Sequence, residues 1–250
     1  MSSPNPIGQP FIELLSVEST NNYAMGLARA AMAQHGAVVF THEQTKGKGQ
    51  RSKEWVSEKD MNIALSILIE PKNLKVSELF LLSMMVAVGV RQFFLNYAEE
   101  IEIKWPNDIY WRDRKAAGIL IENVWQGNEW KFAVIGIGIN VNQTDFGKLN
   151  SKAISLKGIT GKHFEPVILA KELCKNLGDK YQLLISDPSQ IIQQYKAHLY
   201  KLNEQVKLKK DNRVFEATFT DVTVNGQMVV HHAIEEKFDV GEVEWLINGG

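Results

Sequence analysis

The chain has 250 residues, enough for one large hydrophobic core or two unequal domains. Its formal net charge of −1 excludes the global basic field that draws many proteins to nucleic acid or anionic membranes. Cys174 is the single cysteine, which excludes an internal disulfide and a cysteine-cluster metal site, and its apolar helical surroundings favour a core residue. The N-terminus lacks the pattern of a signal peptide, and no uninterrupted apolar run reaches the ~18 residues of a membrane helix. We therefore expect a cytoplasmic protein that does not bind membranes.

Hydrophobic periodicity predicts alternating strands and helices over the first hundred residues. Ser19, Thr20 and Asn21 stand directly before a predicted helix, where their side chains can cap its N-terminus. The same position also favours hydrogen bonds to a polar ligand, because the first N–H groups of a helix have no partner within it. The predicted elements are a strand at 11–17, a helix from about Asn22 to Gln34 ended by Gly36, strands at 37–42 and 61–69, and a helix at 75–98.

A basic, glycine-containing segment, QTKGKGQRSKEW at 44–55, separates the second and third predicted strands. Gly47 and Gly49 allow backbone N–H groups to turn toward one point, an arrangement that binds anions. The neighbouring lysines and arginine add charge that suits phosphate or carboxylate groups. Neither the Walker motif nor the dinucleotide-binding fingerprint is present. Taken alone, the segment is better explained by a solvated, flexible loop.

A second polar segment, IEIKWPNDIYWRDRKAAG at 101–118, follows the long predicted helix. Pro106 has no N–H and cannot continue a strand ladder, so Asn107 and Asp108 come at the end of a rigid element. Binding groups are often placed at such ends. Lys115 precedes two alanines and a glycine, which leave room for a ligand beside it. A surface turn is the alternative interpretation.

Residues 101–142 have the pattern of an antiparallel meander with turns at 112–114 and 126–129. In its last strand Gly136 and Gly138 alternate with isoleucines, so one face of that strand carries no side chain. Glycine at these positions indicates that a ligand or another backbone lies against this face, and Asn140 points to the same side. A crowded crossing of the sheet explains the glycines as well.

The last third of the chain changes from predicted helices to predicted short strands. Two amphipathic helices are predicted at 166–185 and 189–199. From about residue 203 short strands follow, with an Asn225-Gly226 hairpin signal between two of them. We therefore expect a large domain at 1–202, of a size typical of catalytic domains, and a small barrel of hairpins at 203–250.

Four segments together resemble the biotin protein ligases, in that family's order and at its approximate spacings. They are ESTN at 18–21, the loop at 44–55, KWPNDIYWRDRKAAGIL at 104–120 and IGIGIN at 135–140. The resemblance covers nearly the whole chain and implies an α/β fold of α+β type. Its mixed, largely antiparallel sheet would pack with helices in the class II synthetase-like manner, followed by a small SH3-like β-barrel.

The same resemblance implies an activity. An ATP-dependent ligase of this family forms biotinyl-5′-AMP from biotin and ATP with Mg²⁺, then transfers biotin to a specific lysine of a biotin carboxyl carrier protein. Lys115 would lie between the biotin carboxylate and the α-phosphate, with Asn107 and Asp108 on the ATP side and Asp108 a possible partner of the Mg²⁺ that ATP brings. These three are the implied catalytic residues. The matching biotin positions are Ser19, Thr20, Asn21, Gln44, Lys48, Gly49, Gln50, Lys115, Gly118 and Gly136; the matching ATP positions are Gly47, Lys48, Arg51, Trp55, Asn107, Asp108 and Asn140.

Some positions depart from the family's pattern. Gln50 and Ser52 stand where many members carry arginine and glycine, which predicts weaker retention of the adenylate because Gln50 lacks a charge. Leu246 stands where some members carry an arginine near ATP, which puts a nucleotide contact from the small barrel in doubt. The first family motif begins within twenty residues of Met1, so we expect no winged helix-turn-helix and no specific DNA binding.

Two alternatives remain open at this point. A lipoate ligase or transferase has a related fold and the same adenylation chemistry. A biotin-sensing regulator with a small interaction barrel would bind without catalysis, although an intact Asn107, Asp108 and Lys115 argues against lost catalysis. An exposed sheet edge also allows a homodimer.

Overall fold

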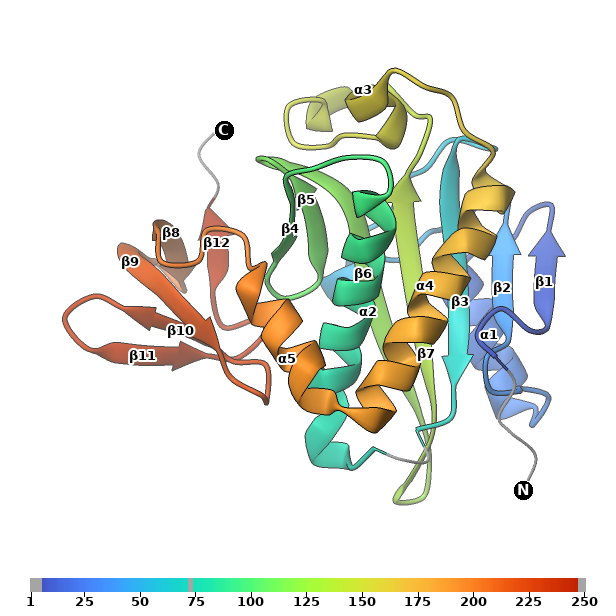
Figure 1. Ribbon diagram of the computed structural model, residues 1–250, viewed down its shortest axis with the longest axis horizontal. Helices are drawn as coiled ribbons and strands as arrows, with labels where there is room; N and C mark the ends of the chain where they lie inside the picture. The colour runs from blue at the N-terminus through green and yellow to red at the C-terminus, as the bar shows by residue number, and fades with distance from the viewer. Residues whose placement is uncertain (1–5, 72–73, 247–250) are drawn as a thin grey trace.

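The computed structural model describes residues 6–71 and 74–246. Within these residues, one sheet has the strand order β1-β2-β3-β7-β6-β5-β4 and a second, smaller sheet follows it in the chain. Figure 1 shows the second sheet beside α5, at the end of the molecule opposite α1. The first sheet consists of β1 (Phe11–Leu14), β2 (Val38–Thr41), β3 (Asn62–Ile69), β4 (Ile101–Lys104), β5 (Asp108–Trp111), β6 (Arg114–Gln126) and β7 (Glu129–Asn140). The helices are α1 (Thr20–Arg29), α2 (Leu79–Leu95), α3 (Leu156–Thr160), α4 (Pro166–Ser186) and α5 (Pro188–Ala197).

The predicted mixed, largely antiparallel sheet is confirmed. β1 and β2 run parallel, while β2-β3, β3-β7 and the β4 to β7 meander are antiparallel. The meander turns at Arg112-Asp113 and at Gly127-Asn128, as the sequence predicts. The first strand is shorter than predicted, since after Leu14 only Val17 forms an isolated bridge, to Gln44. The helices after residue 165 agree with the prediction to within about two residues.

Strand β7 shows how the sheet separates two layers of side chains. Ile135 and Ile137 are buried in the large core that α2, α4 and α5 share, whereas Val134 belongs to a smaller core with α1. Figure 1 shows α2, α4 and α5 covering the near face of the sheet, with α1 behind β3. Gly136 and Gly138 alternate with the isoleucines and therefore lie on the α1 side. A site against these glycines must form on that face.

Helix α1 begins earlier and ends earlier than the predicted range 22–34. Ser19 is its N-cap, as predicted, and its hydroxyl accepts from the N–H of Asn22. The helix ends at Arg29 because Ala31 adopts a left-handed φ of 56°. Gly36 does not end the helix. It has a φ of 81° and its N–H donates to the Leu68 carbonyl at 2.8 Å, which directs the chain into β2.

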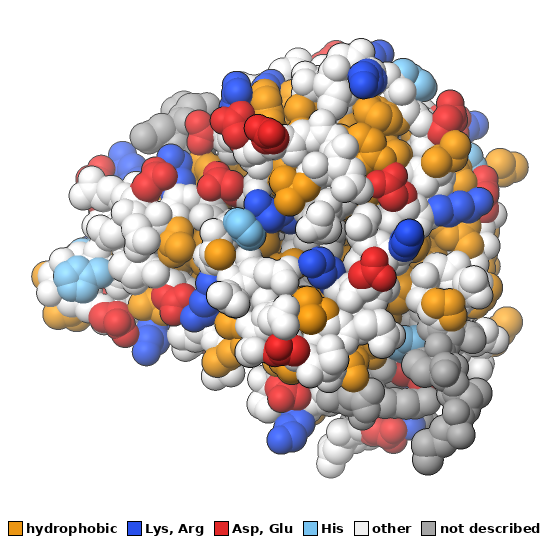
Figure 2. Space-filling model, in the orientation of Figure 1, with side chains coloured by type: hydrophobic (Ala, Val, Ile, Leu, Met, Phe, Trp, Pro, Cys, Tyr) orange, Lys and Arg blue, Asp and Glu red, His pale blue; other side chains and the backbone are white. Residues whose placement is uncertain are grey.

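Helix α2 is the apolar centre of the large core. The predicted helix 75–98 is divided into a 3-10 turn at Val76–Glu78 and α2 itself, which ends at Leu95. By length and composition alone Val76–Leu95 could cross a membrane, but 61% of its most apolar window is buried inside the protein. It packs on α4 and α5, so the core accounts for its composition. On the face that these helices form, Figure 2 shows acidic and basic side chains interspersed.

The second sheet has the order β11-β10-β9-β8-β12. Its strands are β8 (Gln205–Lys210), β9 (Arg213–Val222), β10 (Met228–His231), β11 (Glu235–Phe238) and β12 (Glu244–Leu246). Among the residues that the structure describes, β11 and β12 do not pair with each other. The hairpin signal at Asn225-Gly226 is confirmed, since this turn joins β9 to β10. Closure into an SH3-like barrel stays a prediction.

The turn between β9 and β10 anchors the second sheet to the first. Trp105, which directly follows β4, donates from Nε1 to the Gly226 carbonyl at 2.9 Å, and this bond is buried. Gly226 has a φ of +90°, and a Cβ there would lie 2.3 Å from the Phe80 ring of α2. The glycine therefore allows close approach of the turn to the helix. An ion pair of 2.7 Å between Lys196 and Asp221 adds a second contact.

Replacing Trp105 by phenylalanine should destabilise the protein. The variant leaves the buried Gly226 carbonyl without its donor, which costs about 1–3 kcal/mol. Trp125→Phe is the matched control, because Trp125 is 44% exposed on the β6–β7 hairpin. Urea unfolding measures both, and an equal midpoint for the two variants would show that the Trp105–Gly226 bond carries no stability.

Candidate active site

A cavity lies on the α1 side of the sheet, between the N-terminus of α1, the glycines of β6 and β7, and residues 43–59. We call these residues the site loop and this space the inner cavity. All ten residues predicted to bind biotin line it, although they come from four separate parts of the chain. The lining consists of Ser19, Thr20, Asn21, Gln44, Lys48, Gly49, Gln50, Trp55, Leu65, Asn107, Lys115, Gly118, Ile119, Leu120, Gly136, Ile137 and Gly138.

The polar end of the inner cavity is held by a buried hydrogen-bond network. Gln44 Oε1 accepts from the Thr20 N–H at 2.9 Å and lies 3.2 Å from the Thr20 hydroxyl. Ser66 Oγ, fully buried in β3, lies 2.8 Å from Thr20 Oγ1 and 2.5 Å from Asn21 Oδ1. The Asn21 amide then donates to Glu122 Oε2 at 2.8 Å. The network fixes the direction of three side chains whose remaining donors and acceptors can address a polar ligand.

Parallel pairing of the chain before α1 with the site loop brings Gln44 to Thr20. The Val17 N–H donates to the Glu43 carbonyl at 3.1 Å, and the Thr45 N–H donates back to Val17 at 3.0 Å. Lys46 and Glu18 add an exposed ion pair of 2.7 Å, which raises the pKa of Lys46 and lowers that of Glu18. Both segments therefore enter the site in a fixed register.

The glycine face of the sheet is covered by side chains. A Cβ at Gly136 would lie 2.3 Å from Asn21 Oδ1, and a Cβ at Gly138 would lie 2.3 Å from the Trp55 indole. The sequence predicted a ligand or another backbone against these glycines, and in the structure their nearest neighbours are instead the side chains of Asn21 and Trp55. Trp55 Nε1 is buried there without a hydrogen-bond partner. The indole is thus a wall of the inner cavity with a donor available.

The site loop folds into a small hairpin. The Gly49 N–H donates to the Lys53 carbonyl at 2.7 Å, and the Trp55 N–H donates to the Gly47 carbonyl at 2.9 Å. A Cβ at Gly47 would lie 2.3 Å from the Trp55 carbonyl oxygen, so this glycine closes the hairpin. Gly47 lines neither the inner cavity nor the larger cavity next to it, unlike the other residues predicted to bind ATP. At the hairpin tip Arg51 has a φ of 53° and packs against Gly241 of the second sheet.

Lys115 lies where the inner cavity meets a larger one. Its Nζ forms an ion pair with Asp108 Oδ1 at 2.6 Å and lies 5.6 Å from the centre of the Trp55 ring. Its backbone is bonded to residues 152 and 154, and Asn140 Nδ2 donates to its carbonyl at 3.3 Å. Asn107 Nδ2 donates to the Ile119 carbonyl at 2.6 Å. The predicted catalytic residues therefore lie together on rigid backbone.

The larger space, which we call the outer cavity, has a volume of about 710 Å³. Arg51, Asp108 and Asn140 of the predicted ATP positions line it, together with Trp55, Asn107 and Lys115, which it shares with the inner cavity. Its far wall is Val243, Glu244 and Trp245 of the second sheet. The sequence raised doubt about a contribution from this sheet because Leu246 is not an arginine, yet the residues just before Leu246 reach the cavity.

Lys104 is a cation in the outer cavity wall that sequence reasoning did not select. Its ammonium lies 5.0 Å from the centre of the Tyr110 ring and 5.6 Å from that of Trp245. Burial lowers its pKa to about 8, with Asp108 acting in the opposite direction. The side chain therefore remains mostly protonated at neutral pH and can balance the charge of an anionic ligand. The signal available in the sequence was its position at the end of a predicted strand, directly before Trp105-Pro106. The structure pairs it with Asp108 in the β4–β5 ladder.

The described residues contain no group of three or more His, Cys, Asp or Glu side chains placed to hold a metal ion. Asp108, with its side chain 19% exposed, is a carboxylate in the wall of the outer cavity, paired with Lys115. One carboxylate is sufficient where Mg²⁺ is bound mainly by the phosphates of a nucleotide. The donor set therefore fits a metal that arrives with ATP and does not fit a resident ion.

A family model described as the biotin/lipoate A/B protein ligase family matches residues 14–140. This is just over half of the chain and includes every lining residue of the inner cavity. The chain belongs to the biotin/lipoate A/B protein ligase family. The bifunctional ligase/repressor BirA of Bacillus subtilis is 33% identical over 163 residues, which are 64% of this chain and 50% of that protein. The chain thus spans about half the length of that relative.

Two further similarities agree with this family. The biotin–[acetyl-CoA-carboxylase] ligase of Paracoccus denitrificans is 30% identical over 159 residues, which are 61% of this chain and 65% of that protein. The solved structure of the biotin protein ligase from Aquifex aeolicus, in complex with biotin and ATP, covers 95% of this chain and 99% of its own at a TM-score of 0.80. Its sequence identity is 22%, so this second similarity shows the fold alone.

Proposed function

We propose that this chain is an ATP-dependent biotin protein ligase, which forms biotinyl-5′-AMP and then transfers biotin to a lysine of a biotin carboxyl carrier protein. One observation carries the proposal. The ten predicted biotin positions surround a single inner cavity, and this cavity opens at Lys115 into an outer cavity lined by most of the predicted ATP positions. The neighbouring cavities suit two substrates that react at their junction.

In this proposal biotin occupies the inner cavity with its ureido ring at Thr20, Asn21 and Gln44. The hydrogen-bond network through Ser66 and Glu122 holds these side chains before the ligand arrives, which lowers the ordering cost of binding. The open volume of the inner cavity is only about 50 Å³. Since ligand pockets usually measure about 300–1,000 Å³, some of the lining must move when biotin enters, and we assign this movement to the Trp55 side chain, which covers Gly138. We therefore propose that the site loop opens and then orders again on the ligand.

ATP would occupy the outer cavity with its α-phosphate at the junction. The indole of Trp55 and the ring of Trp245 offer faces for the purine, and Lys104 and Arg51 offer positive charge. Asn140 already donates to the backbone carbonyls of Lys115 and Ile154, so we assign it to holding Lys115 in place on the ATP side. Asp108 would contact the Mg²⁺ that accompanies the phosphates.

Both chemical steps are displacements in which this chain supplies charge and position. A biotin carboxylate oxygen attacks the α-phosphorus and pyrophosphate leaves; then a carrier lysine amine attacks the acyl carbon and AMP leaves. The Lys115 ammonium would lie beside both the carboxylate and the α-phosphate, where it offsets their repulsion and the charge that develops during attack. A fixed cation of this kind needs no nucleophile from the chain, because the partner supplies the amine.

The wider organisation follows from the same proposal. We divide the chain into a catalytic domain at 1–202 and a C-terminal domain at 203–250 that completes the nucleotide wall. We propose a cytoplasmic localisation, which agrees with a single cysteine. Cys174 is buried, and burial raises the pKa of its thiol to about 12. β1 is at one edge of the sheet and could pair two copies. We propose no specific DNA binding.

Pyrophosphate release from Mg²⁺-ATP tests the proposed activity. We expect release that depends on biotin and is not supported by lipoate, because the inner cavity ends in polar groups that match a ureido ring. Release with lipoate alone would assign the chain to lipoate ligation. Biotin binding without release under any condition would favour a biotin sensor.

A further inference from the structure

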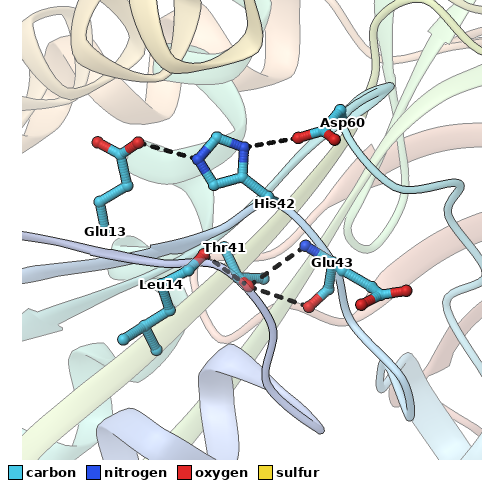
Figure 3. A network of polar contacts seen from close by, with 6 residues as sticks. All are labelled: Glu13, Leu14, Thr41, His42, Glu43 and Asp60. Atoms are coloured by element: carbon cyan, nitrogen blue, oxygen red, sulfur yellow. Dashed lines mark hydrogen bonds and ion pairs between the residues drawn. The ribbon is translucent and has the colours of Figure 1, made fainter.

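His42 lies between two carboxylates that come from different parts of the chain. Its Nε2 is 2.9 Å from Glu13 Oε1 of β1, and its Nδ1 is 2.7 Å from Asp60 Oδ1 in the segment before β3. Figure 3 shows the imidazole ring between these two carboxylates, while the Glu43 carboxylate points away from it. The edge of the ring also contacts the Phe40 ring, at 5.4 Å between centres. We call Glu13, His42 and Asp60 the His42 cluster.

The His42 cluster lies at the base of the site loop. His42 is the residue before the loop begins, and Asp60 is the residue after it ends. The Asp60 N–H also donates to the His42 carbonyl at 2.9 Å, so the two ends are joined through backbone and side chain. The loop between them supplies Gln44, Lys48, Gly49, Gln50 and Trp55 to the inner cavity.

Asp60 adopts a left-handed conformation, with a φ of 61°. This conformation is unfavourable for most residues, although aspartate tolerates it better than most. The chain thus carries a carboxylate at a position where glycine would meet the backbone requirement more easily. The contact of this carboxylate with His42 gives a physical reason for the residue.

We propose that His42 is a positioning residue for biotin binding, which fixes the two ends of the site loop and so holds its side chains toward the inner cavity. The proposal rests on the function proposed above. His42 does not touch the ligand and acts through the geometry of the loop. Its partner Glu13 connects the same point to β1, so the loop base is joined to three segments of the sheet.

The protonation state of His42 sets the strength of this connection. The charged groups that face the ring are Glu13 from β1 and Asp60 from the segment before β3, and both favour the imidazolium. The pKa of His42 is raised above 6.5, first by the hydrogen bond to Glu13 and also by Asp60, against a lowering by desolvation. A raised pKa means that the extra stabilisation is fully present below 6.5 and is lost as the pH rises through the folded-state value.

Hydrogen exchange on the full chain without ligand tests the loop directly. The probes are the amides of Trp55 and Asp60, which donate to Gly47 and His42, expressed as protection factors between about pH 6 and pH 9. In the parent chain we expect protection of both amides to fall as the pH rises. In His42→Gln we expect protection at low pH to be reduced, on the order of fivefold, and to change little with pH.

Two further variants separate charge and global stability from position. Asp60→Asn keeps an oxygen acceptor and tolerates the left-handed backbone. It should therefore retain most of the amide protection at high pH and lose the additional protection that the parent chain shows at low pH. Glu129→Gln is the matched control, because it removes an exposed carboxylate from an ion pair with Lys131 at 2.7 Å on the β6–β7 hairpin. Equal protection in His42→Gln and the parent at low pH, or a uniform loss over the whole chain, would overturn the proposal.

Kinetics supply a second measurement that a merely structural role would not reproduce. We expect His42→Gln to raise the KM for biotin about fivefold with kcat changed less than twofold, and Glu129→Gln to change neither. An unchanged KM in His42→Gln would overturn the positioning role. If the parent chain shows the exchange behaviour but no biotin-dependent turnover, the proposed enzyme function fails and the loop connection stands.

Discussion

Lys115→Ala should abolish most biotin-dependent pyrophosphate release while leaving the fold intact. The Lys115 ammonium lies 2.6 Å from Asp108 at the junction of the two cavities, so its removal takes away a positive charge from the place where we propose that the substrates react. Preorganised charge of this kind contributes on the order of 10²- to 10³-fold to rate. The loss should appear mainly in kcat, because charge develops in the attack and not on binding.

Two variants define the meaning of that result. Lys131→Ala is the matched control, since Lys131 also pairs with a carboxylate, Glu129, but lies on a hairpin away from the cavities. Lys115→Arg keeps the charge and changes its shape, so partial activity is expected from it if charge is the main contribution. Release that survives in Lys115→Ala within about threefold of the parent would remove Lys115 from the mechanism. Circular dichroism and urea unfolding must show that each variant is folded.

The sequence predicted the lining of the inner cavity better than that of the outer cavity. The reason is how far apart in the sequence the lining residues lie and whether each has a local signal. The predicted biotin positions occupy short motifs with local signals: a cap at Ser19, the glycine-containing loop at 44–55, and a strand glycine at Gly136. Their convergence in one cavity follows from the order of the central strands. The outer cavity instead takes Val243, Glu244 and Trp245 from the second sheet, and no local pattern at residue 243 points to residue 108.

The supporting residues of the site were missed for a similar reason. Ser66 lies within a run of buried strand residues, and only its register opposite Gly136 in β7 places it below Asn21. Glu122 is an acidic residue within a half-buried strand, with nothing in the sequence to pair it with residue 21. The end of α1 was placed too late because the helical pattern continues past Ala31, where the backbone turns left-handed. Local periodicity thus predicted the elements, while pairing between strands decided which side chains meet.

The glycine at 136 offers the sharpest test of the proposed biotin end of the site. A Cβ added there would lie 2.3 Å from Asn21 Oδ1 and 2.9 Å from Asn21 Cγ, closer than side chains approach one another. Asn21 cannot simply rotate away, because Ser66 and Glu122 hold both ends of its amide. Overpacking of this kind costs about 1–3 kcal/mol. If that cost falls on the biotin complex, Gly136→Ala raises the Kd for biotin roughly 5- to 150-fold.

A double-mutant cycle and a control distinguish this clash from a general effect of adding a methyl group. Gly178→Ala is the control, because Gly178 lies within α4 and a Cβ there would lie 4.0 Å from Ile7, which is an ordinary contact. This substitution should stabilise the protein by about 0.5–1 kcal/mol. In an Asn21→Ala background the opposing oxygen is gone, so Gly136→Ala should cost much less unfolding free energy than in the parent. Calorimetric titration with biotin gives the Kd, and urea unfolding gives the cycle. Parent-like biotin affinity in Gly136→Ala would mean that biotin binding does not depend on Asn21 held against β7, and the assignment of Asn21 to the biotin site would fail.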